Sequence, residues 1–154
     1  MKIEGFNGRL FAPYQRDGVK WMLEMEAQAS GPKGGFLCDE MGLGKTVQLV
    51  ATILGNPRSR TLIVVPKSII TQWVEEINRF APKLTVAVFD GPDRKIDCDA
   101  DVTITPYTLV SSRNNEATPL HRVFWDRVIL DEAHEIRNKT SKTFKSVCNL
   151  KTDI

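Results

Sequence analysis

Residues 39–46 read Asp39-Glu40-Met41-Gly42-Leu43-Gly44-Lys45-Thr46. A short apolar run, residues 35–38, precedes this stretch, and a run of helical character, residues 47–54, follows it. A strand, a glycine-containing loop and a helix in this order are the context that a phosphate-binding loop requires. The strict pattern of such a loop has glycine where this chain has Asp39. The stretch therefore predicts a nucleotide-binding loop with one departure from the common pattern.

The residue types in this loop suit a phosphate ligand. Gly42 and Gly44 allow the backbone to curl, so that its N–H groups point at phosphate oxygens. The N-terminus of the following helix adds a positive partial charge, and Lys45 adds a full one. Thr46 offers a hydroxyl group to a magnesium ion. The loop alone predicts nucleotide binding, whereas hydrolysis needs evidence from elsewhere in the chain.

A second polar stretch, Asp131-Glu132-Ala133-His134, directly follows the apolar residues 128–130. Phosphoryl transfer to water needs a magnesium ion near the phosphates and a group that orients the attacking water. We expect Asp131 to hold magnesium, mostly through water, and Glu132 to polarise the attacking water. Acidic pairs are also common on solvated turns. Combined with the glycine loop, this pair predicts an ATPase site in which Lys45, Asp131 and Glu132 have catalytic roles.

Apolar runs alternate with helical patterns along the chain. Besides residues 35–38, the runs that read as strands are residues 61–65, 84–89, 102–105 and 127–130. Helical patterns begin near Pro13, after Ser68, which is a candidate cap for the helix that follows it, and at about Ser141. The last helix is expected to turn four residues inward: Phe144, Val147, Cys148 and Leu150. Residues 111–119 are polar and without periodicity, which predicts a loop. The alternation predicts a three-layer α/β fold, with a parallel sheet covered by helices on both faces.

Composition excludes several classes of protein. A length of 154 residues fits one domain, and a net charge of +2 is too small to indicate nucleic-acid binding by itself. The three cysteines are far apart, without a CxxC pair and with only two histidines, which predicts neither a zinc site nor a disulfide framework. No apolar run approaches the length of a membrane span, and the N-terminus lacks a signal segment. We therefore expect an intracellular protein with reduced thiols.

These motifs resemble those of the Swi/Snf-type DNA-dependent ATPases of helicase superfamily two. The resemblance is carried by residues 39–46, by residues 61–65 with Pro66-Lys67-Ser68 and Gln72-Trp73, and by Asp131-Glu132-Ala133-His134 with Ile136-Arg137-Asn138. In that family an acidic pair before Met-Gly-Leu-Gly-Lys-Thr is usual, so Asp39 becomes a mark of the family. Tyr14-Gln15 is similar to the family's adenine-recognising glutamine motif. The resemblance covers the chain from about residue 10 to residue 150.

The resemblance implies a P-loop NTPase fold of the RecA-like type, with ATP and Mg²⁺ as ligands. The implied nucleotide-binding residues are Tyr14, Gln15, Asp39, Met41, Gly42, Leu43, Gly44, Lys45 and Thr46. Thr46 and Asp131 would serve the metal. His134 would link the nucleotide site to the moving parts of the motor, the alternative being a buried histidine of the core.

Four residues would lie near the DNA backbone according to the same resemblance: Lys67, Ser68, Thr105 and Tyr107. Lys67 is also compatible with an ordinary surface lysine. Trp73 is expected to pack its helix rather than to stack on a base. Pro106 departs from the threonine that the family pattern has beside the tyrosine.

The family's motor has two RecA-like lobes, and ATP binds between them. Residues 1–154 resemble the amino-terminal, ATP-binding lobe, incomplete at its C-terminal end. The Thr-Gly-Thr-Pro-like motif and the second lobe, which carries the arginine finger, are not found in the sequence. In this class of fold the strand of that motif lies between the phosphate-loop strand and the strand before Asp131. We therefore expect residues 1–154 to leave this central position of the sheet open.

The function implied is DNA-stimulated ATP hydrolysis that drives translocation on duplex DNA or nucleoprotein, as in chromatin remodelling or DNA repair. The location would be the nucleus in a eukaryote and the cytoplasm otherwise. One alternative is a DEAH-box RNA helicase, favoured only by the tetrapeptide at residues 131–134. Met41-Gly42-Leu43-Gly44 and Gln72-Trp73 argue against it. The other alternative is a non-hydrolysing module that binds nucleotide or a protein partner.

Overall fold

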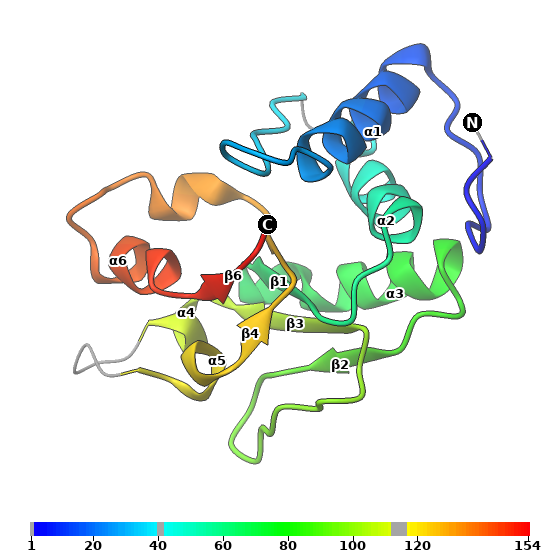
Figure 1. Ribbon diagram of the computed structural model, residues 1–154. Helices are drawn as coiled ribbons and strands as arrows, with labels where there is room; N and C mark the ends of the chain where they lie inside the picture. Colours follow the sequence, from blue (N-terminus) through cyan, green and yellow to red (C-terminus); the bar gives the residue numbers. More distant parts are fainter. Residues whose placement is uncertain (1, 40–41, 112–116) are drawn as a thin grey trace.

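The computed structural model describes residues 2–39, 42–111 and 117–154 (Figure 1). Along the chain these residues form α1 (Pro13–Glu26), α2 (Lys45–Gly55), β1 (Thr61–Val65), η1 (Lys67–Ile69), α3 (Ile70–Phe80), β2 (Val86–Val88), β3 (Val102–Pro106), α4 (Tyr107–Val110), α5 (Pro119–Arg122), β4 (Phe124–Trp125), β5 (Arg127–Leu130), η2 (Ala133–Ile136), α6 (Lys142–Cys148) and β6 (Lys151–Thr152). Within these ranges no helix has the length and apolar character needed to cross a lipid bilayer.

A four-stranded parallel sheet with the order β2-β3-β1-β5 forms the centre of the fold. β1 lies between β3 and β5, with Thr61 opposite Val102 on one side and Arg127 on the other. Every residue of β1 and β3 is buried, as expected of parallel strands that are covered on both faces. β1 and β5 have the predicted bounds, β2 is shorter than predicted and β3 is one residue longer.

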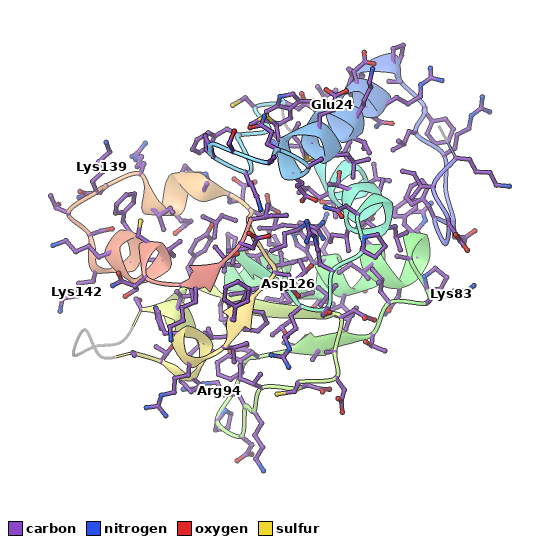
Figure 2. All side chains as sticks on the ribbon, in the orientation of Figure 1. Glu24, Lys83, Arg94, Asp126, Lys139 and Lys142 are labelled. Carbon is purple, nitrogen blue, oxygen red and sulfur yellow. The ribbon has the colours of Figure 1, made fainter. Side chains whose placement is uncertain are left out.

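The two faces of the sheet are covered by different helices, because successive residues of a strand point to opposite sides. Ile63 and Val65 pack with residues of α2 and α3. Leu62 and Val64 pack with residues of α4, α5 and α6. Figure 1 shows α2 and α6 on opposite sides of the sheet, and Figure 2 shows side chains filling the space between the layers, with Lys83 and Lys139 at the periphery. The predicted three-layer α/β fold is confirmed.

The helices that were predicted from sequence are present, with differences in detail. α1 starts at Pro13 and packs on α2, where Val19 is fully buried beside Ala51. α6 follows Ser141, whose hydroxyl oxygen accepts the Phe144 N–H at 3.1 Å. Cys148 was expected to face inward but is exposed. It is one residue beyond the buried Val147, and one residue rotates a helical side chain by about 100°.

The segments next to α5 and before α3 also differ from expectation. Residues 112–116 of the predicted loop lie outside the described residues, and Pro119, its last residue, begins α5. Ser68 was expected to cap the helix that follows it, but no side-chain cap is formed there. The chain instead enters α3 through the 3₁₀ turn η1, so Ser68 is a surface residue of that turn.

The apolar residues 35–38 were predicted to form a strand and do not. The end of the chain lies beside β5, the edge strand of the four-stranded sheet. There β6 pairs in parallel with β4, and the Val128 N–H donates to the Ile154 carbonyl at 2.9 Å. A 3.0 Å ion pair between Lys33 and Asp153 holds the start of the apolar run beside this segment. Among the described residues β6 pairs only with β4, so residues 35–38 have no strand partner, and Phe36 is 85% exposed.

A buried ion pair ties α1 to the sheet. Arg127, at the start of β5, donates to both carboxylate oxygens of Glu26 at 2.6 Å, and both side chains are more than 90% buried. The same guanidinium donates to the Asn56 carbonyl at 2.7 Å. The side-chain amide of Asn56 also donates to this carboxylate, at 2.7 Å, so the buried charge has both a forked ionic partner and a neutral donor. The pair therefore fixes the C-terminal end of α1 relative to β5.

We predict that Arg127→Met lowers the free energy of unfolding by about 3–5 kcal/mol, because it leaves the Glu26 carboxylate buried without its positively charged partner. Urea unfolding followed by far-UV circular dichroism measures the loss. The matched control is Lys20→Met, which removes the exposed Lys20–Glu24 pair and should change stability by no more than about 0.5 kcal/mol. Equal stabilities of the two variants would contradict the prediction.

Candidate functional site

The glycine loop leads directly into α2. Gly44 is the N-cap of α2 and has φ 79°, and Gly42 has φ 82°, so both lie in the left-handed region that favours glycine. A Cβ built on Gly42 meets no atom within 4 Å, which means that the space beside this residue is open. Met41, one of the predicted loop residues, lies outside the described residues, as does Glu40. The described part of the loop thus presents an open, glycine-lined turn at a helix N-terminus.

Asp39 ties the start of this loop to α2. Its main-chain carbonyl accepts a 2.7 Å hydrogen bond from the Lys45 ammonium group. Its carboxylate accepts a 2.9 Å bond from the side-chain amide of Gln48, which is completely buried. Thr46, next to Lys45, is half-buried in the first turn of α2. The residue that departs from the strict loop pattern is therefore part of the loop's own scaffold.

Gln15 connects α1 to the same loop. Its amide oxygen accepts the Phe11 N–H at 2.9 Å, and its amide nitrogen donates to the Leu43 carbonyl at 3.1 Å. The amide nitrogen carries two hydrogens, so the bond to Leu43 leaves the group able to donate once more. Tyr14 lies beside it with 41% of its surface exposed. The structure thus brings Gln15 of the predicted adenine-binding pair into contact with the loop.

We predict that Gly44→Ala destabilises the chain more than Gly42→Ala. Both substitutions force an alanine to a positive φ, at a cost of about 1–2 kcal/mol. At Gly44 the new methyl group would also lie 2.7 Å from the Gln15 amide nitrogen, whereas at Gly42 it would meet open space. Thermal unfolding of both variants checks the order, and an equal fall in Tm would contradict it.

Asp131 and Glu132 lie at the carboxyl end of β5. The Asp131 N–H still donates to the Val64 carbonyl at 3.0 Å, and Glu132 then turns the chain away with φ 52° and ψ 47°. Among the residues that the structure describes, Glu132 is the one non-glycine residue with a positive φ. Backbone strain of this kind concentrates at functional sites. The Glu132 carboxylate remains about one third exposed.

The Asp131 carboxylate is held by two donors. One oxygen accepts the indole N–H of Trp73 at 2.8 Å, and the other accepts the Glu132 N–H at 2.9 Å. Sequence reasoning assigned Trp73 a packing role only. Trp73 does pack in the core, where it is 1% exposed, but a buried indole N–H needs an acceptor. A tryptophan predicted to lie in the core therefore indicates a polar partner for its indole N–H, and this was the feature of the sequence that could have revealed the contact with Asp131.

His134 is a surface residue. Its side chain is 62% exposed, with Nδ1 3.1 Å from a Glu132 carboxylate oxygen and Nε2 3.9 Å from one of Glu135. The alternative of a buried core histidine is therefore wrong. The linking role implied by family resemblance stays a prediction, and the contact with Glu132 is compatible with it.

The four residues expected near DNA fall into two groups. Lys67 and Ser68 are exposed on η1, and the Lys67 ammonium group lies 3.2 Å from the Asp90 carboxylate. The Gly91 N–H and then Lys67 lower the pKa of that carboxyl group. Thr105 is completely buried and donates to the Phe89 carbonyl. Because β3 is covered on both faces, a side-chain contact of Thr105 with DNA does not fit this structure.

Tyr107 is also buried, at 6% exposed, and its hydroxyl group donates to the main-chain carbonyl of Asp131 at 2.7 Å. It therefore supports the acidic stretch from within and does not present its side chain to a surface ligand. Burial raises the pKa of the Tyr107 phenol above its ordinary value near 10, and the negative charge of Asp131 raises it further. The phenol is consequently a hydrogen-bond donor throughout the physiological pH range.

We predict that the free energy of unfolding falls as the pH rises above about 10, because the unfolded chain releases the Tyr107 proton there while the folded chain retains it. The absorbance of phenolate follows the titration directly. Subtracting the titration of Tyr107→Phe from that of the wild-type chain isolates this residue. A difference curve with its midpoint at or below pH 10 would contradict the prediction.

Two other features, a cluster of metal ligands and a cavity, could mark a functional site apart from the glycine loop and the acidic stretch. Among the described residues no group of three or more His, Cys, Asp or Glu side chains is placed to hold a metal ion. A cavity of about 860 Å³ is lined by residues 2–10 and Arg16, ahead of and at the start of α1. Its lining includes none of residues 39–46, so it is distinct from the glycine loop. The geometry of the loop and of the acidic stretch, rather than this cavity, defines the candidate site.

The fold has a parallel sheet between two layers of helices, a glycine loop that caps α2 and an acidic pair at the end of β5. These features define the class of fold as a RecA-like ATPase lobe. The family model described as SNF2-related domain matches residues 14–154. The chain therefore belongs to the SNF2-related family.

Named relatives and solved structures agree with this assignment. ATP-dependent helicase rhp16 of Schizosaccharomyces pombe is 39% identical over 160 residues, which cover 91% of this chain and 18% of that protein. ISWI chromatin-remodeling complex ATPase ISW1 of Saccharomyces cerevisiae is 35% identical over 150 residues, covering 88% and 13%. The Sulfolobus solfataricus SWI2/SNF2 ATPase core in complex with dsDNA superposes with a TM-score of 0.85 at 34% identity, covering 99% of this chain and 32% of that one. The chain thus spans a minor part of the length of each.

The family assignment corrects one interpretation. Residues 131–134 spell the DEAH tetrapeptide, which had left a DEAH-box RNA helicase open as an alternative. The match over residues 14–154 is to the SNF2-related domain, and the similar proteins include chromatin-remodelling and DNA excision repair factors. The tetrapeptide is therefore a feature that the two groups share, and the RNA helicase alternative is set aside.

Proposed function

We propose that this chain binds ATP and Mg²⁺ at residues 39–46 and that, in a complete motor, it hydrolyses ATP in response to duplex DNA. The observation that carries the proposal is the open glycine turn at the N-terminus of α2, with the Lys45 ammonium group bonded across it to the Asp39 carbonyl. A helix N-terminus and a lysine together favour a phosphate group. The names of the relatives, which include ATP-dependent helicases, support the same ligand.

Each residue of the site has a role that its position allows. The Lys45 ammonium group would leave the Asp39 carbonyl and bind a phosphate oxygen. Thr46 and Asp131 would hold Mg²⁺, which prefers oxygen ligands and keeps several waters, so a dedicated cluster of protein ligands is not required. Glu132 would orient the attacking water. Gln15 and Tyr14 would contact the adenine, with Gln15 using the N–H that does not bond to Leu43.

We propose that residues 1–154 act as the ATP-binding lobe and that hydrolysis needs a second RecA-like lobe, which would supply an arginine finger. An arginine finger accelerates phosphoryl transfer by about 10³–10⁵. Among the described residues β5 is an edge strand of the four-stranded sheet, and a further central strand would fit beside it, where Ile154 now accepts the Val128 N–H. The lobe alone would then bind nucleotide with little turnover.

Duplex DNA is the proposed partner of the complete motor. The superposed Sulfolobus structure is described as a complex with dsDNA. On this chain Lys67 and Ser68 are exposed and are the candidates for contact with the DNA phosphate backbone. Thr105 and Tyr107 are buried and would support this region through hydrogen bonds within the fold. A nuclear location would follow in a eukaryote, in keeping with relatives named for chromatin remodelling. A zinc ion or a membrane has no part in this proposal.

We predict that residues 1–154 bind a fluorescent ATP analogue in the presence of Mg²⁺, and that Lys45→Ala weakens binding at least about tenfold because it removes a charged hydrogen bond to phosphate, worth about 1.5–3 kcal/mol. Glu132→Gln should retain binding, because this residue acts on water. Lys20→Ala, which removes an exposed lysine that pairs with Glu24, is the matched control. Equal binding by the wild-type chain and Lys45→Ala would contradict the proposal.

ATP turnover measured with duplex DNA, with RNA and with neither separates the remaining functions. In a motor that contains the second lobe, stimulation by duplex DNA that is lost in both Lys45→Ala and Glu132→Gln supports translocation. Nucleotide binding without turnover in that complete motor would favour a non-hydrolysing module.

A further inference from the structure

We propose that Trp73 and Tyr107 are positioning residues that fix Asp131 for its magnesium ion, one through the carboxylate and the other through the main chain. This inference rests on the proposed function of Asp131. Neither residue needs to touch nucleotide or metal for this role. Both act by hydrogen bonds that the folded chain already contains.

The bond from Trp73 sets the orientation of the Asp131 carboxylate. The indole N–H lies 2.8 Å from Oδ2, and the Glu132 N–H lies 2.9 Å from Oδ1. A carboxylate oxygen has two lone pairs, so each oxygen keeps one acceptor site for water or a metal ion. The two bonds come from different directions, one from α3 and one from the chain itself. They define the plane of the carboxylate and therefore the direction in which its free acceptor sites point.

The bond from Tyr107 fixes the peptide between Asp131 and Glu132. Its hydroxyl group donates to the Asp131 carbonyl at 2.7 Å, and this carbonyl belongs to the peptide that precedes the strained φ of Glu132. Tyr107 packs with the helices on the face of the sheet opposite to the one that Trp73 joins. Asp131 is thus held from both faces. Rotation of this peptide would move both the metal-binding carboxylate and the Glu132 side chain.

A second buried tryptophan shows that packing alone does not explain Trp73. Trp125 is also 1% exposed, and its indole N–H donates to the Leu120 carbonyl, five residues away, at 2.9 Å. That bond is local and involves a main-chain acceptor. Trp73 bonds instead to a carboxylate 58 residues away, at the end of another element. Hydrogen bonds to ligating groups orient them, and their loss typically costs about 10–100-fold in metal affinity.

The test is the magnesium dependence of nucleotide binding, measured on residues 1–154 with a fluorescent ATP analogue in Mg²⁺ and in excess EDTA. Trp73→Phe keeps a buried ring and removes the N–H, and Tyr107→Phe removes only the hydroxyl group. We expect each to lower the ratio of the Kd in EDTA to the Kd in Mg²⁺ by about tenfold. The Kd in EDTA should stay unchanged. Trp125→Phe, the matched control, should leave the ratio unchanged.

The outcomes separate this inference from the proposed function. If the wild-type chain binds no nucleotide, the proposed function of the site fails. If the wild-type chain binds and Lys45→Ala does not, but Trp73→Phe and Tyr107→Phe keep the wild-type ratio, the positioning role is overturned. A ratio that falls equally in Trp125→Phe would overturn it too, since the effect would then be a general loss of packing.

A second measurement does not depend on a core variant that folds or on nucleotide. In the wild-type chain labelled with ¹³C and ¹⁵N, the indole N–H resonance of Trp73 is assigned by triple-resonance spectroscopy. Asp131→Asn should shift this resonance and leave that of Trp125 in place, because the carboxylate acceptor is replaced by an amide. An unchanged Trp73 resonance would overturn the hydrogen bond on which the inference depends.

Discussion

The pairing of β1 between β3 and β5 is the constraint on which the rest of the structure depends. β1 is buried on both faces, so its backbone groups must bond to neighbouring strands, and both neighbours run parallel to it. Parallel strands bring their carboxyl ends to one edge of the sheet. The turn η1, the start of α4 and the Asp131–Glu132 stretch follow β1, β3 and β5 at that edge. The contacts of Trp73 and Tyr107 with Asp131 are consequences of this convergence.

The ion pair of Arg127 and Glu26 connects the sheet to α1, a helix that packs on α2 rather than on the sheet. Burying two charges is costly, and a hydrophobic pair can be as stable, so stability alone does not account for it. The forked geometry, however, permits only one placement of the end of α1 relative to β5. Since α1 also carries Gln15, which bonds to the loop at Leu43, the pair helps to fix the loop relative to the strand that carries Asp131.

Local patterns predict most of the fold, and non-local contacts decide the rest. Residues 61–65 and 127–130 form the predicted strands because both pair within the sheet, where the first strand is fully buried and the apolar residues of the second are half-buried. Residues 35–38 have a similar pattern but form no strand, since a strand requires a neighbour. The residues of the candidate site were named from their motifs. The bonds that orient them were not, because donors such as Trp73 and Tyr107 are distant in sequence from Asp131.

Asp39 illustrates how a departure from a motif acquires a physical reason. A glycine at this position could offer the main-chain carbonyl that Lys45 bonds to, but not the carboxylate that takes the amide of Gln48. Aspartate therefore adds a tie between the start of the loop and the buried side of α2. In this structure the Lys45 ammonium group bonds to the Asp39 carbonyl at the start of the loop. Under the proposed function an arriving phosphate would displace that 2.7 Å bond, because a charged phosphate oxygen accepts from an ammonium group more strongly than a neutral carbonyl does.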